Sequence, residues 1–422
     1  MLEENQSSYK WYILALSTAT GTFAAAFPFS CMPVLFKEIS EDLDLSLVQI
    51  GTVWGMASLA GIFVSLIAGV LSDRFGVKPI LTIFCIMVGV TGALRGMADS
   101  FGFLAITVFA NGIARLIVPI TLTKTIGIWF KGKNLGMAMG ISAMGMGFGL
   151  MLGPMISATV MSPLLGGWRN VMYLYGALST AVGILWLLFG REPQQFDSTT
   201  GTSGTVPFRQ AFSRLIRIKA IWLIGLTMLF RIGCLMGMTG YVPLYLRELG
   251  WSIASADGTL AAFYGISTVC VVPLCFLSDK IGSRKAILFP ALIVSMICIG
   301  LVPFVEGGTI WLLMILAGIS MDGFMSLTVT MLLETEGIGP AYSGTALGIL
   351  FTIVHIGSVS SPPLGNSLAS INLGLPFIFW ASLSIVALVT LSLTKETGWR
   401  RTKTIDSDRM TVSDVNRGTK PD

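Results

Sequence analysis

The sequence predicts an all-α integral membrane protein with twelve transmembrane helices arranged as two pseudo-symmetric six-helix halves. Three observations lead to this fold class. Hydrophobic residues make up 54% of the 422 residues and charged residues only 12%, whereas soluble domains are nearer a quarter charged. Apolar runs long enough to cross a bilayer recur along the chain. A charged sequence motif, called the phrase below, also occurs twice, about half a chain apart, which indicates an internal duplication.

The apolar runs are twelve in number, and each approaches the roughly 20 residues that a helix needs to cross a bilayer. Lipid offers no hydrogen-bond partner to backbone N–H and C=O groups, so these runs must be helical. Their continuous apolar character excludes the short alternating strands of a large membrane barrel. The predicted spans are about 12–36, 47–72, 78–98, 101–126, 134–160, 170–190, 220–246, 257–278, 286–305, 309–335, 342–368 and 374–395.

Lysine and arginine predict the orientation of these spans. If the N-terminus is placed inside, the predicted outside loops hold only Lys37, Arg169 and Arg247, and most other basic residues fall inside. Basic residues favour the cytoplasmic side, so both termini are expected in the cytoplasm and the chain in the cell membrane. The N-terminal MLEENQSSYK lacks a basic region and a cleavage site, so the first run is interpreted as a retained span.

Composition divides the chain into four parts. A polar stretch with the run DSTTGTSGT precedes the basic amphipathic FRQAFSRLIRIK and separates six spans from six. Such a stretch suits a linker whose amphipathic part lies on the membrane surface. The predicted organisation is an N-terminal bundle at 1–190, a cytoplasmic linker at 191–219, a C-terminal bundle at 220–395 and a disordered cytoplasmic tail at 396–422.

The two halves repeat each other. The phrase GVLSDRFGVKPIL at 69–81 returns as FLSDKIGSRKAIL at 276–288, and Ser72 and Ser278 are 206 residues apart (278 − 72). GMAMGI at 136–141 returns as GTALGI, 208 residues later. Several places therefore agree on nearly one offset, which indicates parallel repeats of the kind found in some transporter folds.

The first phrase also carries a family resemblance. Together with the six-plus-six spans and the polar linker, the pattern G-x-x-x-D-R-x-G-x-K resembles the Major Facilitator Superfamily of secondary transporters over about residues 10–395. It is formed here by Gly69, Asp73, Arg74, Gly76 and Lys78.

This resemblance implies that Asp73 faces the start of the eleventh span and helps to hold the cytoplasmic side shut. The gating residues would be Asp73, Arg74, Gly76 and Lys78, with Asp279 and Arg284 from the degenerate second copy. The plainer alternative is that these charges only anchor the span ends inside.

Four ionisable residues lie near the centres of predicted spans: Arg115, Arg231, Asp322 and His355, the only histidine. Ionisable groups at this depth are costly and usually functional. The first three fall on spans 4, 7 and 10, which line the central cavity in the resembled family. Arg115 and Asp322 are 207 residues apart (322 − 115), so they are repeat partners of opposite charge. Arg95, Lys124 and Glu334 lie nearer span ends and are expected to snorkel.

Two arginines against one aspartate predict an anionic substrate, because the guanidinium fork suits carboxylate or phosphate. We expect Arg115, Arg231 and Asn111, one turn before Arg115, to bind substrate. Asp322 or His355 would carry a coupling proton, since both can titrate. The structural alternatives are an Arg231–Asp322 salt bridge, an Arg115 bonded to backbone carbonyls, and a neutral hydrogen-bonded His355.

Two branches of the family are resembled. WFKGKNLGMAMGISAMGMGFG at 129–149 is similar to monocarboxylate and other organic-anion porters, although the charged pair that monocarboxylate carriers place in span 8 is missing. The spacing of Gly140, Gly149, Gly153 and Pro154 resembles proton-driven drug exporters. The leading hypothesis is alternating-access transport of an organic anion such as a carboxylate, with proton coupling open. The alternative is proton-driven export of amphipathic compounds.

Other function classes find little support in the sequence. An enzyme is not expected, since the chain has one histidine, no G-x-S-x-G motif, no metal-ligand cluster and no phosphate loop. The six cysteines lack metal-site spacing and are interpreted as small buried hydrophobes. We expect no cofactor, metal or nucleic-acid partner. The expected partners are an anionic small molecule, the lipid bilayer and protons, and the chain is expected to be a monomer.

Overall fold

The computed structural model describes residues 2–65, 71, 75–130, 134–191, 208–338 and 342–398. Twelve of its helical segments are long and apolar enough to span a membrane, which confirms the predicted number. Asp73 and Arg74, most of the linker, and the tail beyond residue 398 lie outside the described residues.

The N-terminal half is an all-helical bundle whose first and fifth spans contain short π-helical turns. Its elements are α1 (Leu2–Thr20), η1 (Gly21–Ala26), α2 (Phe27–Leu43), α3 (Leu47–Val64), α5 (Val77–Arg95), α6 (Phe101–Trp129), α7 (Leu135–Ile156), η3 (Ser157–Met161), α8 (Ser162–Leu165) and α9 (Trp168–Phe189).

The C-terminal half is a second bundle, preceded by the short amphipathic helix α10 (Phe208–Leu215). Span 10 is divided into two helices, α14 and α15, whereas its repeat partner α6 is a single helix. The elements are α11 (Lys219–Glu248), α12 (Ile253–Ile281), α13 (Lys285–Leu301), η4 (Val302–Phe304), α14 (Gly308–Ile319), α15 (Met321–Leu333), α16 (Ser343–Leu368) and α17 (Leu375–Leu393).

Local sequence signals explain several helix boundaries. Ser46 and Gln49 form a capping box at the start of α3, in which each side chain satisfies a backbone N–H of the first turn. Gly76 before α5 and its repeat partner Gly282 after α12 both have positive φ, 82° and 73°. Glycine adopts such angles without strain, so the repeated phrase makes a glycine turn in both halves.

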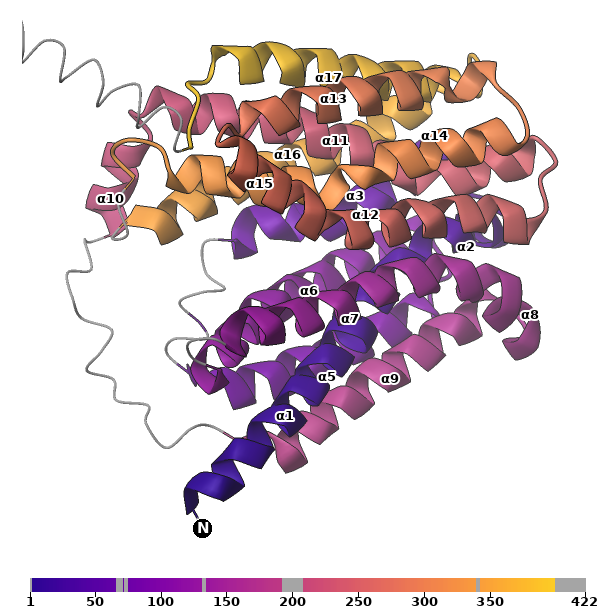
Figure 1. Cartoon of the computed structure of the whole chain (residues 1–422). Coiled ribbons are helices and arrows are strands. Elements are labelled where there is room, and N and C mark those ends of the chain that lie inside the picture. Colours follow the sequence, from indigo (N-terminus) through magenta and orange to yellow (C-terminus); the bar gives the residue numbers. More distant parts are fainter. Residues whose placement is uncertain are drawn as a thin grey trace, which may run out of the picture.

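The two bundles lie side by side in Figure 1, with α1, α5, α6, α7 and α9 below, α11 and α13 to α17 above, and α2 and α3 reaching up to the level of α12. They meet towards the right-hand end and diverge towards the left-hand end, where the N-terminus and α10 lie. We call the left-hand side the termini end and the right-hand side the far end. The main contacts between halves are α3 with α16, α7 with α12, and α2 with α11.

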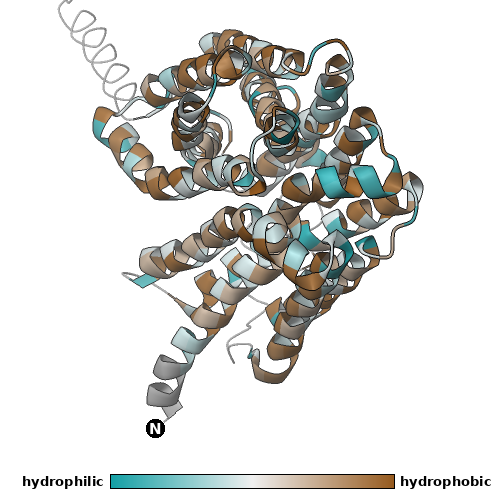
Figure 2. Cartoon of the chain, turned by 90° about the vertical axis from the view of Figure 1, so that its right-hand side faces the viewer, coloured by the Kyte–Doolittle hydropathy of each residue, from teal (hydrophilic) through white to brown (hydrophobic). Residues whose placement is uncertain are grey.

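The surface of the bundle matches a lipid environment. Large apolar side chains such as Val272 and Phe276 are 71% and 69% exposed, and such extensive apolar exposure is unusual for a soluble monomer. Figure 2, seen from the far end, shows brown hydrophobic residues along most helices and teal hydrophilic residues on the helix ends that face the viewer.

The first residues of the predicted tail contact the C-terminal half. The Glu396 carboxylate accepts hydrogen bonds from the backbone N–H groups of Arg284 (2.9 Å) and Lys285 (3.3 Å) and from the Ser283 hydroxyl (2.7 Å). A carboxylate satisfies the free N–H groups at the start of α13 and suits the positive end of its dipole. Residues 396–398 are therefore ordered against the C-terminal half.

Candidate functional site

Span 10 is interrupted at Ser320, close to its centre. Ser320 has φ −97° and ψ −1°, and it separates α14 from α15. The half-buried Asp322 lies in the first turn of α15. Its backbone N–H donates to Ser267 Oγ of α12 at 3.0 Å, and that hydroxyl donates to Asp322 Oδ2 at 2.6 Å. One serine therefore satisfies the N–H that the break leaves free and fixes the carboxylate.

Arg231 of α11 lies behind the same break and is completely buried. Its Nη2 donates to Ser320 Oγ at 3.1 Å, and Ser320 also lies 3.2 Å from Ser295 Oγ. The guanidinium sits 5.4 Å from the ring centroid of Phe324, whereas its Nε and Nη1 atoms have no hydrogen-bond partner. The structure shows no ion pair between Arg231 and Asp322, so the salt bridge considered from the sequence is not formed in this conformation.

Arg115 of α6 has very different surroundings. Its guanidinium lies 4.3 Å from the ring centroid of Phe29, and Phe29 in turn stacks on Trp54 with centroids 4.6 Å apart. Arg115 makes no hydrogen bond or ion pair with any residue that the structure describes, yet none of its nitrogen atoms is sealed from solvent. The alternative in which backbone carbonyls satisfy Arg115 is therefore not observed.

Tyr264 of α12 connects these two positions, although no sequence pattern pointed to it. Its side chain is 3% exposed and lies within electrostatic range of both Arg115 and Asp322. Tyrosine is common in membrane spans for packing reasons, so only the fold distinguishes this one. Tyr264 of the C-terminal half therefore lies within electrostatic range of Arg115 across the interface of the halves, and of Asp322 within its own half.

His355 of α16 lies in the contact between α3 and α16. Its Nδ1 is 2.6 Å from the Phe351 carbonyl, and its ring presses against Gly61 of α3, where any Cβ would collide with it. His355 is also within electrostatic range of Arg115. One ring nitrogen is thus engaged within its own helix, as in the structural alternative, while the ring itself touches the opposite half.

Asn111 and Arg95 are both buried in the N-terminal half. Asn111 is 4% exposed, and its amide donates to the Val88 carbonyl at 3.0 Å and to Thr91 Oγ1 at 3.1 Å. These bonds pack α6 against α5 within the N-terminal half, and a role of Asn111 in binding substrate stays a prediction. The snorkelling expected for Arg95 is wrong, because this side chain is 2% exposed and donates to the Pro28 carbonyl at 2.9 Å.

The expected gating residues are only partly described. Asp73 and Arg74 lie outside the described residues, and the Lys78 side chain lies near Gly190 of its own half. In the second copy, Arg284 pairs with Asp279 at 2.5 Å and with Glu334 at 2.7 Å. The Glu334 carboxylate raises the pKa of the Arg284 guanidinium above its usual value. This copy therefore ties together elements of the C-terminal half in the present conformation.

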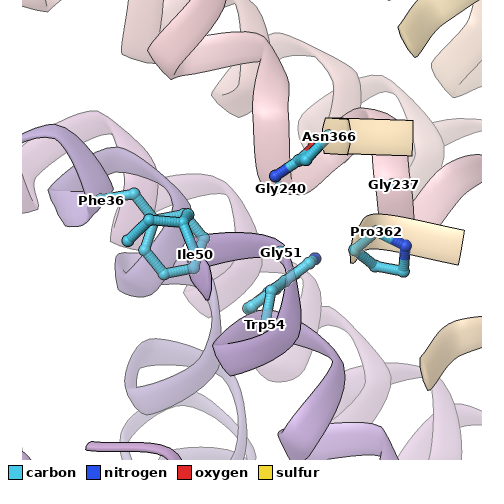
Figure 3. A pocket seen from close by; sticks show the side chains of 8 residues that line it. All are labelled: Phe36, Ile50, Gly51, Trp54, Gly237, Gly240, Pro362 and Asn366. Carbon is cyan, nitrogen blue, oxygen red and sulfur yellow. The ribbon is translucent and has the colours of Figure 1, made fainter. Parts of the chain in front are cut away.

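Contacts at the far end hold the two halves together. Trp54 Nε1 donates to the Met236 carbonyl at 2.8 Å, and Asn366 Nδ2 donates to the Leu47 carbonyl at 2.9 Å. Lys37 pairs with Glu248 at 3.2 Å. Figure 3 shows the small gap left here, with Phe36, Ile50, Gly51 and Trp54 on one side and Gly237, Gly240, Pro362 and Asn366 on the other.

A buried ion pair lies beside this closure. Arg247, predicted to lie in an outside loop, is 8% exposed and contacts both carboxylate oxygens of Asp257, at 2.6 and 2.7 Å. The Thr159 hydroxyl of the other half lies 3.5 Å from the same carboxylate. No sequence signal selected this pair, because Asp257 stands at the very edge of its apolar run.

The termini end shows the opposite condition. A Cβ added at Gly136 or Gly140 of α7, or at Gly344 of α16, would meet no atom within 4 Å. Further along α7, by contrast, Gly147 approaches Thr268 of the other half so closely that a Cβ would collide. The glycines therefore pack tightly in the middle of α7 and face open space near its start, so the bundles are closed at the far end and separated at the termini end.

Comparison with known proteins identifies the fold and the family. The profile described as Major Facilitator Superfamily matches residues 18–358. The chain belongs to the Major Facilitator Superfamily. The membership agrees with the twelve spans and the repeat, and it favours a transport protein over an enzyme.

Curated relatives are similar at low identity. The chain is 27% identical to a probable nitrate/nitrite antiporter of Thermus thermophilus over 65% of this chain and 62% of that protein. It is 26% identical to the hexuronate transporter of Escherichia coli over 44% of this chain and 42% of that protein. It is 25% identical to a probable sulfoacetate transporter of Cupriavidus necator over 84% and 86%. The match thus spans about three fifths and two fifths of the first two relatives' own lengths.

Solved structures support the fold alone. A bacterial homologue of the human lysosomal transporter Spinster, in an inward-facing and occupied conformation, superposes with a TM-score of 0.75 at 17% identity. That match covers 92% of this chain and 95% of the other. The nucleoside transporter NupG, solved as a point mutant, gives a TM-score of 0.74 at 15% identity, over 92% and 100% of the chains.

Proposed function

We propose that this protein is a secondary transporter that carries a small organic anion across the membrane by alternating access. The observation that carries the proposal is Arg115: a guanidinium near the centre of span 4, accessible and without an acidic or hydrogen-bonding partner among the described residues. An arginine cannot discharge itself by losing a proton. An anion that docks on it would compensate a charge that the protein leaves uncompensated.

The roles of the other polar residues follow from their surroundings. The Tyr264 phenol belongs to the C-terminal half and lies within electrostatic range of Arg115, so an anion held by both groups would link the two halves. Asp322, held by Ser267 rather than by a cation, is the best candidate to carry a coupling proton, with His355 second. Arg231 has no accessible nitrogen here, so we assign it to the break in span 10 and not to a clamp on the substrate.

The conformation is compatible with one step of an alternating-access cycle. The far end is closed by contacts between the halves, and the glycines at the termini end meet no neighbour. If both termini are cytoplasmic, as the basic residues predict, this state is open to the cytoplasm. Docking of an anion at Arg115 would then draw the Tyr264 phenol closer, and protonation of Asp322 would remove its repulsion of the anion and favour closure.

The substrate class is narrowed by the relatives. Nitrate or nitrite, hexuronate and sulfoacetate, named for three of them, are all anions, and the last two are organic. The planar fork of arginine donates two parallel hydrogen bonds to a carboxylate, and a sulfonate also presents two acceptor oxygens to it. We therefore infer a small carboxylate or sulfonate as the substrate of this chain.

Uptake into proteoliposomes tests the proposal. The panel contains hexuronate, sulfoacetate, nitrate and a lipophilic cation, each measured with and without a proton gradient. We expect saturable uptake of at least one organic anion, which Arg115→Gln abolishes and the surface control Arg209→Gln leaves unchanged. Uptake of the cation alone would favour the amphipathic-compound exporter instead. Wild-type anion uptake by Arg115→Gln would contradict the proposed site.

A further inference from the structure

A second cavity lies at the termini end of the C-terminal half, remote from Arg115. It has a volume of about 310 Å³ and is lined by the start of α11, the segment after α15 and the segment after α17. Its polar lining includes Lys219, Lys395 and Thr397, and its apolar lining includes Leu223 and Leu393. Nothing in the proposed transport cycle uses this cavity.

The polar part of the cavity is suited to an oxyanion. Lys219 is the first residue of the 30-residue helix α11, and no side chain caps that helix start. The free N–H groups and the positive dipole end of a helix favour a phosphate-like group. Lys219 and Lys395 add two positive charges against the one carboxylate of Glu336 in the lining, which leaves an excess of one.

Thr397 supplies an independent indication of a ligand. Its side chain is 5% exposed, lines the cavity, and its hydroxyl has no hydrogen-bond partner. A buried hydroxyl without a partner carries a desolvation cost that proteins rarely tolerate. The hydroxyl is covered as it stands, and a rotation of the Thr397 side chain into the cavity would let an oxygen atom of a bound phosphate satisfy it.

The apolar surroundings indicate where that phosphate comes from. Leu393, at the end of α17, is 63% exposed on the outer surface. Trp222, one turn into α11, is 46% exposed and donates its indole N–H to the Ile216 carbonyl at 2.8 Å. Tryptophan favours the boundary between headgroups and hydrocarbon. The cavity is thus placed at the height of the headgroups, with apolar side chains leading away from it.

We propose that this cavity binds the phosphate of an anionic phospholipid in the leaflet at the termini end. Lys219, Lys395, the Thr397 hydroxyl and the first N–H groups of α11 contact the phosphate, and an acyl chain runs along Leu393. The site is separate from the substrate site at Arg115. The proposal does not depend on the identity of the transported compound.

Native mass spectrometry of the full chain in detergent tests the site. The probes are phosphatidylglycerol, phosphatidylcholine and soluble glycerol 3-phosphate. We expect phosphatidylglycerol to bind more tightly than phosphatidylcholine, and glycerol 3-phosphate not to displace it. Lys219→Gln with Lys395→Gln should weaken phosphatidylglycerol binding by about tenfold or more, as expected for two lysines near an anionic headgroup. Lys280→Gln, on the same end of the bundle, is the matched control.

Thr397→Val keeps the test decisive if the double variant does not fold. The hydroxyl has no protein partner to lose, so valine should leave the melting temperature of the lipid-free protein unchanged or raise it. It should still lower phosphatidylglycerol affinity severalfold. Wild-type affinity in both variants would overturn the site. Displacement of the lipid by glycerol 3-phosphate would overturn the lipid source and assign the cavity to a soluble phosphate compound.

Discussion

The two repeat-related spans at the centre of the molecule, span 4 and span 10, have diverged in both backbone and charge. Span 4 is the unbroken α6 of 29 residues, and its Arg115 is accessible and has no acidic or hydrogen-bonding partner in the part of the chain that the structure describes. Span 10 is broken at Ser320, and its Asp322 is held by Ser267. Duplication therefore supplied two equivalent positions, which we propose to have become an anchor for an anion in span 4 and a proton carrier in span 10.

The backbone differences have identifiable chemical causes. Pro119 in α6 has no N–H to offer the Arg115 carbonyl four residues earlier, yet the helix continues through it. In span 10 the break leaves the Asp322 N–H without a partner in its own helix, and this group donates to Ser267 Oγ. The Ser320 hydroxyl at the break accepts a hydrogen bond from Arg231. Broken helices in the middle of a membrane are tolerated where other side chains satisfy the backbone.

Substitution of Arg115 should have the largest effect on anion transport of all the changes in these two spans. Arg115→Ala should lower the transport rate or apparent affinity for the anion by roughly a hundredfold, since about two charge-assisted hydrogen bonds of about 1.5 kcal/mol each are lost. Arg115→Lys should fall between this variant and the wild type, because charge remains and the fork is lost. Initial uptake rates in proteoliposomes measure this. Equal rates for all three proteins would remove the distinction between the two spans.

The second effect concerns Asp322 and the coupling of anion transport to a proton gradient. Asp322→Asn should abolish accumulation driven by a proton gradient while leaving anion exchange down a concentration gradient, because the amide keeps the bond with Ser267 but cannot take up a proton. His355→Gln serves as the paired variant. Uphill and exchange uptake are measured in the same vesicles. Loss of uphill transport in His355→Gln alone would assign the proton to span 11 instead of span 10.

A third, smaller effect should appear at the break itself. Ser320→Ala removes the one hydrogen-bond partner of the buried Arg231, and an unsatisfied buried group costs about 1–3 kcal/mol. The melting temperature in detergent should drop by several degrees. Ser295→Ala, which leaves the Arg231 bond intact, should cost less. A larger loss from Ser295→Ala would show that Ser320 does not act through Arg231.

The weakest effect should be that of Pro119. Pro119→Ala restores a backbone N–H for the Arg115 carbonyl and should change the free energy of unfolding by only about 1 kcal/mol or less. Transport should fall at most severalfold. Uptake and melting curves together check this. A loss as large as that of Arg115→Ala would mean that the proline, and not the guanidinium alone, prepares span 4 for its substrate.

Much of the architecture could be predicted because it follows from composition and period. The twelve spans, the two halves and the paired glycine turns at Gly76 and Gly282 needed only hydropathy and repeat spacing. The exposure of individual arginines could not be predicted in this way. Arg95 and Arg231 are both buried and Arg115 is accessible, although all three are isolated cations in apolar runs, because the rotation of each helix about its axis depends on its neighbours.

The chain's residue order was sufficient to establish a duplicated twelve-span membrane protein and to select Arg115 and Asp322 as repeat partners of opposite charge. Those conclusions depend on local hydrophobicity and on the spacing of the internal repeat, neither of which requires knowledge of distant contacts. The packing of the helices established the rest: the break at Ser320, the position of Tyr264 within electrostatic range of Arg115 and Asp322, and the closure of the far end. These features depend on side chains more than a hundred residues apart coming together, such as Trp54 and Met236.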